Sequence, residues 1–319
     1  MLEGVLRSGA SMSEGGDKHR RNWKTYNEQL VVRGEFYLDL TFVSNWKKEL
    51  AEMNKNKRGG QYKFPESFIR WEAVWKQWID YRGLEGVARS LTKMGFIPEY
   101  TDYTTIWHRV HDMVPELKLP TERELEVASD GSGLKTNNAG EYRVFRYGEK
   151  TKKKHLVVVI TADIKHRKLL KVEAHVEGEG KSEPQIAEKH LKELKGEDIG
   201  VKKFYGDGAF DTNSLFECLE ESGIESAIKI RKNASTDYCR GSKRRREEVR
   251  EYRRLGYDQW AIEKGYGMRW VATEGIFSAV KRKFGENTVI RGKNELIAEA
   301  IQRFWSYDVL RDYGLSRTA

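Results

Sequence analysis

Apolar residues change their spacing near residue 120, from a helical rhythm to a strand-like one. Before that point, large apolar residues recur every three or four positions, the stripe of an amphipathic helix, at Phe68, Trp71, Val74, Trp75 and Trp78. Core packing explains these tryptophans better than stacking on bases. Residues 26–52 mix helical and strand-like spacing, and the charged, glycine-ended stretch 54–60 predicts a loop. We expect a flexible tail over residues 1–20 and a helical N-terminal region over 21–120.

Two short helices are predicted late in this region, over residues 84–91 and from Asp102 onward. Asp102 is suited to cap the second helix, and a stretch containing glycine and proline turns the chain between the two. Such a pair fits a helix-turn-helix, whose second helix would present Thr104, Thr105 and Arg109 to DNA. An ordinary helical hairpin has the same pattern and remains the alternative.

Strand-like segments dominate from residue 121. Apolar runs predict an antiparallel meander followed by helix, strand, helix and strand, over residues 125–129, 142–147, 155–164, 169–176, 185–194, 201–205, 213–222 and 224–230. The stretch Asp-Gly-Ser-Gly at 130–133 predicts a turn after the first strand. The pattern indicates an α/β domain with a mixed sheet over residues 121–313, closed by a helix at 294–313.

The balance of charge favours a polyanionic partner. Lys and Arg number 58 against 49 Asp and Glu, which gives a net charge of +9. The run Lys243, Arg244, Arg245 and Arg246 stands in a basic stretch at about 231–265. A solvated charged face is the ordinary interpretation of such a run, but its place between candidate catalytic acids favours binding of phosphates.

The cysteine count and the apolar runs bear on the compartment. Cys218 and Cys239 form no Cys-x-x-Cys pair, so neither a zinc site nor a disulfide framework is predicted. No apolar run approaches the roughly 18 residues of a membrane span, and the first residues lack the apolar centre of a signal peptide. We expect a cytoplasmic protein with no membrane partner.

Three carboxylates stand where predicted elements would bring them to a common site: Asp130, Asp207 and Glu274. Acidic side chains that converge bind Mg²⁺ or Mn²⁺, because hard cations choose oxygen ligands. Asp207 is preferred to Asp211 because it follows a predicted strand directly. Asp163 lies within reach of the same strand ends but is part of no recognisable motif.

Residues 269–285 predict one amphipathic helix that carries the third carboxylate. Glu274 and Lys281 lie seven residues apart, which places both on one face, two turns from each other. A metal-binding carboxylate and a phosphate-binding ammonium would then face one site. A surface Glu and Lys on an ordinary helix is the alternative.

Three stretches resemble prokaryotic insertion-sequence transposases of the DDE type, in the branch related to insertion sequences four and five. They are SDGSG at 129–133, YGDGAFD at 205–211 and the helix at 269–284, within a resemblance that covers about residues 80–313.

The same branch has a signature, Tyr-x₂-Arg-x₃-Glu-x₆-Lys. Tyr266, Arg269, Glu274 and Lys281 reproduce it with one additional residue between Arg269 and Glu274. Glu274 and Lys281 carry over by their spacing, whereas Arg269 stands one residue too far away.

The resemblance implies an RNase H-like catalytic domain with the DDE residues on the first strand, after the fourth strand and on a later helix. It implies two divalent ions, Mg²⁺ or Mn²⁺, cleavage at the ends of an insertion sequence, and transfer of the freed 3′-hydroxyl into target DNA. Double-stranded DNA, a homodimer on DNA and a place at the prokaryotic nucleoid follow as expectations. A metal-dependent nuclease or resolvase, and a non-catalytic DNA-binding derivative of a transposase, remain as alternatives.

Overall fold

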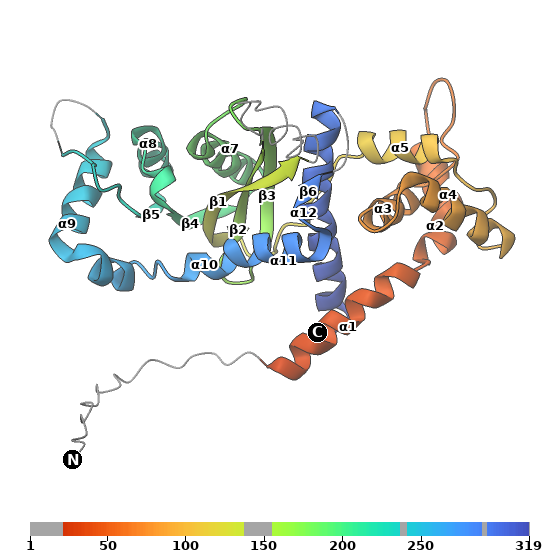
Figure 1. Cartoon of the computed structure of the whole chain (residues 1–319), viewed down its shortest axis with the longest axis horizontal. Helices are drawn as coiled ribbons and strands as arrows, with labels where there is room; N and C mark the ends of the chain where they lie inside the picture. Colours follow the sequence, from red (N-terminus) through yellow and green to blue (C-terminus); the bar gives the residue numbers. More distant parts are fainter. Residues whose placement is uncertain (1–21, 137–154, 237–240, 289–291, 319) are drawn as a thin grey trace, which may run out of the picture.

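The computed structural model describes residues 22–136, 155–236, 241–288 and 292–318, and it shows a helical region beside a mixed α/β domain (Figure 1). The expected tail at 1–20 and the expected strand at 142–147 lie outside the described residues.

The N-terminal region consists of helices joined by loops, and residues 26–52 are mostly helical. Its helices are α1 (Trp23–Glu35), the 3₁₀ turn η1 (Phe36–Leu38), α2 (Thr41–Met53), α3 (Glu66–Trp75), α4 (Tyr81–Lys93) and α5 (Tyr103–Asp112). The stripe on α3 packs inward, because Phe68, Trp71 and Val74 are buried against α2, α4 and α5. Trp78 is 47% exposed and donates to the Tyr37 hydroxyl at 2.6 Å. The tryptophan stripe is therefore mainly core, as predicted.

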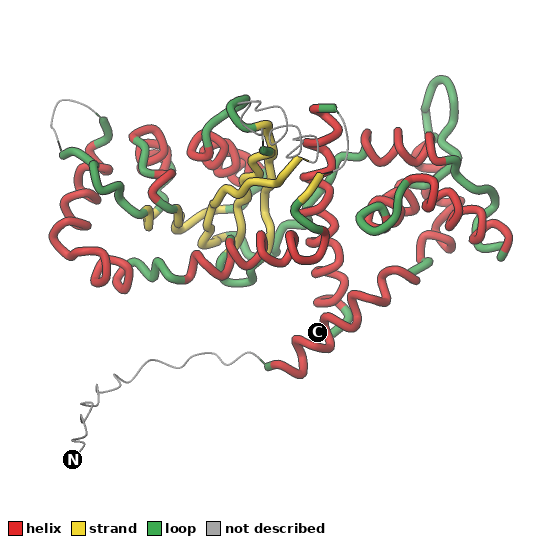
Figure 2. The backbone as a smooth tube through the Cα atoms, in the orientation of Figure 1, coloured by secondary structure: helices red, strands yellow, loops and turns green. Residues whose placement is uncertain are grey.

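A six-stranded mixed sheet organises the second part of the chain (Figure 2). Its strands are β1 (Glu124–Thr136), β2 (Leu156–Asp163), β3 (Lys168–Val176), β4 (Gly200–Gly206), β5 (Glu225–Ile228) and β6 (Asn287–Thr288). The order is β3-β2-β1-β4-β5, with β6 also pairing with β1. β1, β2 and β3 form an antiparallel meander, and β4 and β5 add in parallel beyond β1. This is the RNase H-like arrangement expected from the sequence.

The prediction of a turn at residues 130–133 is wrong. β1 continues to Thr136, and Asp130 through Gly133 pair in register with residues 157–160 of β2. The glycines lower the strand propensity of this stretch, but the ladder with the apolar β2 compensates for them. Asp130 is consequently held within a sheet strand and does not sit on a loop.

Helices cover both faces of the sheet. One face is packed by α7 (Glu183–Gly196) and α8 (Asn213–Glu221), and the other by α11 (Glu274–Phe284) and α12 (Lys293–Ser316). α12 also joins the two parts of the molecule, because Phe304 belongs to the sheet core while Trp305 belongs to the N-terminal core.

The helix expected over residues 269–285 is divided in two. α10 (Met268–Ala272) ends at Thr273, and α11 starts at Glu274. Before them, α9 (Lys243–Glu263) contains the basic run and bends at Gly256, whose φ of 75° is in the left-handed region that glycine tolerates. The break at Thr273 matters because it determines where Arg269 and Glu274 lie relative to β1.

Candidate active site

Asp130 is the central carboxylate of the candidate site. It is only 6% exposed, on the face of β1 that α10 and α11 cover. Its Oδ2 accepts a hydrogen bond from the Thr273 hydroxyl at 3.1 Å and pairs with Arg269 Nη1 at 3.3 Å. Its Oδ1 accepts from the Gly131 amide at 3.0 Å.

Asp207 lies level with Asp130, directly after the end of the neighbouring strand β4. The parallel register pairs Ala128 with Tyr205, so each aspartate stands two residues past the last pair, where β1 and β4 separate. Asp207 caps the 3₁₀ turn η2 (Gly208–Phe210) by accepting from the Ala209 amide at 2.8 Å. Sheet register therefore brings the first two predicted carboxylates to one place.

Electrostatics link the third carboxylate to them. Burial raises the pKa of Asp130 above its ordinary value, the Arg269 charge opposes this, and the charges of Glu274 and Asp207 raise it further. Like charges influence each other in this way only at short range or in a poorly screened interior. Asp130 is therefore within electrostatic range of both Glu274 and Asp207, and we call these three residues the acidic cluster.

Lys281 faces the same strand as Glu274. Its Nζ donates to the Ser132 hydroxyl at 2.9 Å, and Ser132 lies two residues after Asp130 on the same face of β1. The N-terminal end of α11 therefore lies by Asp130 and its C-terminal half by Ser132, as the shared helix face predicted.

Tyr266 and Arg269 complete the four signature positions around β1. The guanidinium of Arg269 stands 5.3 Å from the centre of the Tyr266 ring. Burial raises the pKa of Tyr266 to about 12, and its buried hydroxyl has no hydrogen-bond partner among the described residues. A buried donor without a partner is costly, so this hydroxyl is suited to a substrate oxygen.

The extra residue before Glu274 is absorbed at Thr273. This residue connects α10 to α11, and its hydroxyl is within 3.3 Å of the Arg269 carbonyl as well as bonded to Asp130. Arg269 therefore reaches Asp130 despite the altered spacing, which the sequence comparison alone did not predict.

Glu183 is a fourth carboxylate that the sequence reasoning missed. It begins α7 and reaches over Gly131, where a Cβ would lie 2.5 Å from its carboxyl group. Burial raises the pKa of Glu183, and the charges of Asp207 and Asp130 raise it further. The glycine in the SDGSG stretch was the available signal, because it allows this close approach.

The two rejected aspartates have structural roles. Asp211 is buried and accepts from the Arg231 amide at 3.0 Å and from Nε and Nη2 of Arg245 at 2.6 and 3.1 Å. Asp163 closes the turn between β2 and β3 by accepting from the His166 amide at 2.9 Å. Both carboxylates are satisfied by protein donors, which agrees with leaving them out of the site.

The donor set suits a hard divalent cation. Asp130, Asp207, Glu274 and Glu183 offer only carboxylate oxygens, and their mutual repulsion would be relieved by a bound cation. As placed, no three His, Cys, Asp or Glu residues within the described ranges are close enough together to hold a metal ion. Arg269 meets Oδ2 of Asp130, so binding of a cation at that oxygen requires this pair to separate.

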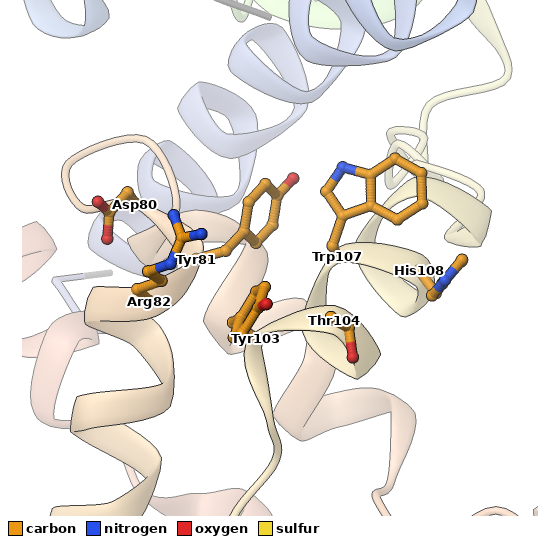
Figure 3. A pocket seen from close by; sticks show the side chains of 7 residues that line it. All are labelled: Asp80, Tyr81, Arg82, Tyr103, Thr104, Trp107 and His108. Atoms are coloured by element: carbon orange, nitrogen blue, oxygen red, sulfur yellow. The ribbon is translucent and has the colours of Figure 1, made fainter.

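The predicted second DNA-reading helix exists as α5, and a pocket lies between it and the start of α4 (Figure 3). Thr104 and His108 line this ≈ 340 Å³ pocket with Asp80, Tyr81, Arg82, Tyr103 and Trp107. The connection between the helices, residues 94–102, is longer than the three or four residues of a helix-turn-helix turn. DNA reading by α5 therefore remains a prediction.

Two of the three residues proposed to read DNA on α5 serve its cap. The Thr104 and Thr105 hydroxyls both donate to the Asp102 carboxylate and lower its pKa. Arg109 pairs with Glu66 at 3.1 Å and lies over the Tyr62 ring. Thr104 is exposed, so it is the most accessible of the three to a ligand.

The basic run on α9 is largely paired within the protein. Arg244 reaches Glu248 at 3.0 Å, and Arg245 forms the buried pair with Asp211. Arg246 donates to the Gly241 carbonyl at 2.6 Å. Lys243 is the most exposed of the four, with a single ion pair to Glu247 at 4.0 Å.

The sheet order and the acidic cluster on β1, after β4 and on α11 define an RNase H-like catalytic domain. A family model described as a transposase DDE domain matches residues 122–308, more than half of the chain, and a second of the same description matches 31–139. The chain belongs to the DDE transposases, which are metal-dependent phosphoryl-transfer enzymes.

Solved structures with some likeness include three transposase or integrase assemblies. The piggyBac transposase synaptic complex with hairpin DNA is 12% identical, with a TM-score of 0.35, and the match covers 91% of this chain and 79% of that one. The Drosophila P element transposase strand transfer complex is 12% identical, with a TM-score of 0.28, and the match covers 59% of this chain and 42% of that one. The simian T-cell lymphotropic virus intasome with PP2A regulatory subunit B56 gamma is 12% identical, with a TM-score of 0.28, and the match covers 70% of this chain and 67% of that one. Likenesses at this level bear on neither fold nor function.

Proposed function

We propose that the protein cleaves DNA at the ends of an insertion sequence and joins the freed 3′-hydroxyl to target DNA. The observation that carries this proposal is the acidic cluster of Asp130, Asp207 and Glu274 in the catalytic domain of a DDE transposase. Both reactions are in-line phosphoryl transfers, so a single site can perform them in turn.

Asp130, Asp207 and Glu274 would hold two divalent ions, Mg²⁺ or Mn²⁺, with Glu183 as a further carboxylate on the α7 side. When bound, such ions activate the attacking oxygen and stabilise the leaving oxygen of the transferred phosphate. The Arg269 charge beside Asp130 opposes the rise in the pKa of this carboxyl that burial causes.

The remaining signature residues would orient the scissile phosphate. Lys281 already donates to Ser132 beside Asp130, and its ammonium can donate equally to a phosphate oxygen. The Tyr266 hydroxyl, which has no partner among the described residues, can donate to a second oxygen. Positioning of this kind contributes to the rate because the reacting groups meet already aligned.

The partners proposed are double-stranded DNA, as element ends and as target, and a second copy of the chain in a homodimer on DNA. We place the protein at the prokaryotic nucleoid, in the cytoplasm. Within the described ranges, no helix is long and apolar enough to cross a membrane.

A cleavage and strand-transfer assay tests this function. The DNA should carry the inverted repeats that flank the gene, and strand transfer should be assayed with pre-cleaved ends in Mg²⁺ or Mn²⁺. We expect Asp130→Asn, Asp207→Asn and Glu274→Gln each to reduce both reactions by at least about 10³-fold, comparable to loss of a major electrostatic contribution. DNA binding should persist in each variant.

Asp163→Asn is the matched control, because it also neutralises an aspartate at a strand end but one that serves a turn. Folded Asp163→Asn protein should retain cleavage. Full activity of any of the three site variants would remove the assignment, and cleavage without strand transfer would identify a nuclease instead.

A further inference from the structure

A basic groove runs between α1, α11, α12 and the turn that joins β2 to β3. We define it by six cations that line it, contributed by four separate parts of the chain: Arg33, Lys165, Arg167, Arg282, Lys283 and Arg311. Its volume is ≈ 960 Å³. Figure 1 shows α1 crossing beside the lower part of α12, close to α11.

No Asp or Glu lines this groove within the described part of the chain. Lys165 and Arg311 reach carboxylates that stand outside the lining, Glu122 at 2.7 Å and Asp312 at 3.7 Å. Arg282 donates to the Ser278 carbonyl at 3.2 Å, which neutralises no charge. The groove therefore holds an excess of positive charge.

Crowding among these cations is visible at Arg33 and Lys283. Burial lowers the pKa of Arg33, and the Arg311 charge lowers it further against the opposing effects of Tyr307 and Tyr26. The pKa of Lys283 is lowered by burial and by the Arg33 charge. The buried Nε of Arg33 has no hydrogen-bond partner among the described residues. An anion in the groove would relieve the repulsion and accept this bond.

The groove adjoins the candidate active site through α11. Gly275, Ala279 and Arg282 line it, and at about 100° per residue they lie roughly 80–160° around the helix from Glu274 and Lys281. One helix thus carries Glu274 of the acidic cluster on one side and residues of the basic groove on the side turned away from it.

We propose that this groove binds the phosphate backbone of duplex DNA next to the site of cleavage. Cations spread over four elements match a repeating anion better than a single small one, and backbone contacts of this kind hold DNA without reading its sequence. The assignment rests on the proposed DNA substrate, and it adds a surface outside the DDE residues and outside α5.

The test is the salt dependence of binding to a labelled duplex of random sequence, measured by fluorescence anisotropy with EDTA present so that no cleavage occurs. The variant is Arg282→Gln with Lys283→Gln in the full chain. We expect about tenfold weaker binding at fixed salt. The slope of log K against log salt should fall by about 1–2, since each cation that no longer neutralises a phosphate lowers it by about one.

Lys192→Gln with Lys195→Gln is the matched control, because it removes two exposed lysines from α7 on the opposite face of the sheet. Its affinity should stay within about twofold and its slope unchanged. Equal losses of affinity in the two double variants, or none in the groove variant, would overturn the proposal. A loss of affinity for duplex RNA without a loss of affinity for duplex DNA would also overturn it.

A second measurement applies if the groove variant does not fold. Acetylation of wild-type protein with and without duplex should show Lys165 protected by DNA more than Lys192, and equal protection would contradict the groove. Failure of the proposed function is distinct, because it would appear as absent cleavage in Mn²⁺ by a protein that still binds through the groove in EDTA.

Discussion

Helices α9 and α11 are both strongly charged, but their charged side chains have different kinds of neighbours. On α9 several cations meet carboxylates, as in the pair of Arg245 with the buried Asp211 and that of Arg244 with Glu248. On α11 the charges are left with like neighbours, Glu274 beside Asp130 and Lys283 beside Arg33.

The difference separates charge that stabilises the fold from charge that is available to a ligand. A buried ion pair is already satisfied and has little left to offer a phosphate or a metal ion. A cluster of like charges destabilises the protein until a counter-charge binds, which is common at functional sites. By this criterion α11 is the functional helix and α9 is mainly structural.

The largest effect expected from this comparison is on stability, at Arg245. Arg245→Gln would leave the Asp211 carboxylate, whose side chain is 0% exposed, without its bidentate partner. We expect the free energy of unfolding to fall by about 3–5 kcal/mol, measured by denaturant titration. Arg254→Gln, at an exposed position on the same helix, should change it by no more than about 0.5 kcal/mol.

A pair analysis sharpens this result. Combining Arg245→Gln with Asp211→Asn should cost less than the sum of the two single changes, because each removes the same interaction. Strict additivity would show that the pair is not what holds α9 in place, and the contrast between the helices would fail.

An effect of intermediate size is expected at Glu183, on the pH dependence of stability. The folded-state pKa of Glu183 is raised above its ordinary value of 4.5, so the protonated form favours folding. Its contribution to stability is present below that value and is lost as pH rises through the folded pKa. At pH values above this range, and in EDTA, Glu183→Gln should therefore have a higher Tm than wild type. Its Tm should also decline less as pH rises.

Glu217→Gln is the control, since Glu217 is an exposed carboxylate on the neighbouring α8. Added Mn²⁺ should stabilise wild type more than Glu183→Gln if Glu183 contributes to the metal site. An identical decline of Tm with pH in wild type and Glu183→Gln would show that the acidic cluster does not include this residue.

The smallest effect is expected at Lys243, the exposed end of the basic run. Its charge is already shared with Glu247, so Lys243→Gln should weaken binding of duplex DNA by no more than about twofold to threefold, in the anisotropy assay used for the groove. A loss of affinity as large as that of the groove variant would reverse the ranking of the two helices.

Much of the catalytic domain could be predicted because its elements are strongly patterned. The continuous apolar run in β2 and the amphipathic α7 and α12 match their expected ranges closely. The place of Asp207 just after a strand was also predicted, and the shared face of Glu274 and Lys281 follows from helical periodicity, whereas Asp130 lies within β1 and not in the expected turn. Their catalytic roles remain predictions.

What the sequence did not predict depends on contacts between distant segments. The groove gathers Arg33 with Lys165 and Arg282, which no local window brings together. β1 runs through two glycines because β2 pairs with it, a tertiary effect that overrides propensity. The break between α10 and α11 falls at Thr273, whose hydroxyl donates to Asp130, 143 residues away in the chain.

The position of α11 has a mechanical consequence. Glu274 at its start and Lys283 near its end belong to one rigid rod of eleven residues, packed on the sheet through Ile276, Phe277 and Val280. If DNA binds at the C-terminal end of this helix, any shift of the helix also moves the Glu274 carboxylate at its N-terminal end. Binding energy from contacts to the DNA backbone, which do not depend on sequence, then helps to align the reacting phosphate. Weaker binding in the groove would therefore lower the rate of the chemical step as well as the affinity for DNA.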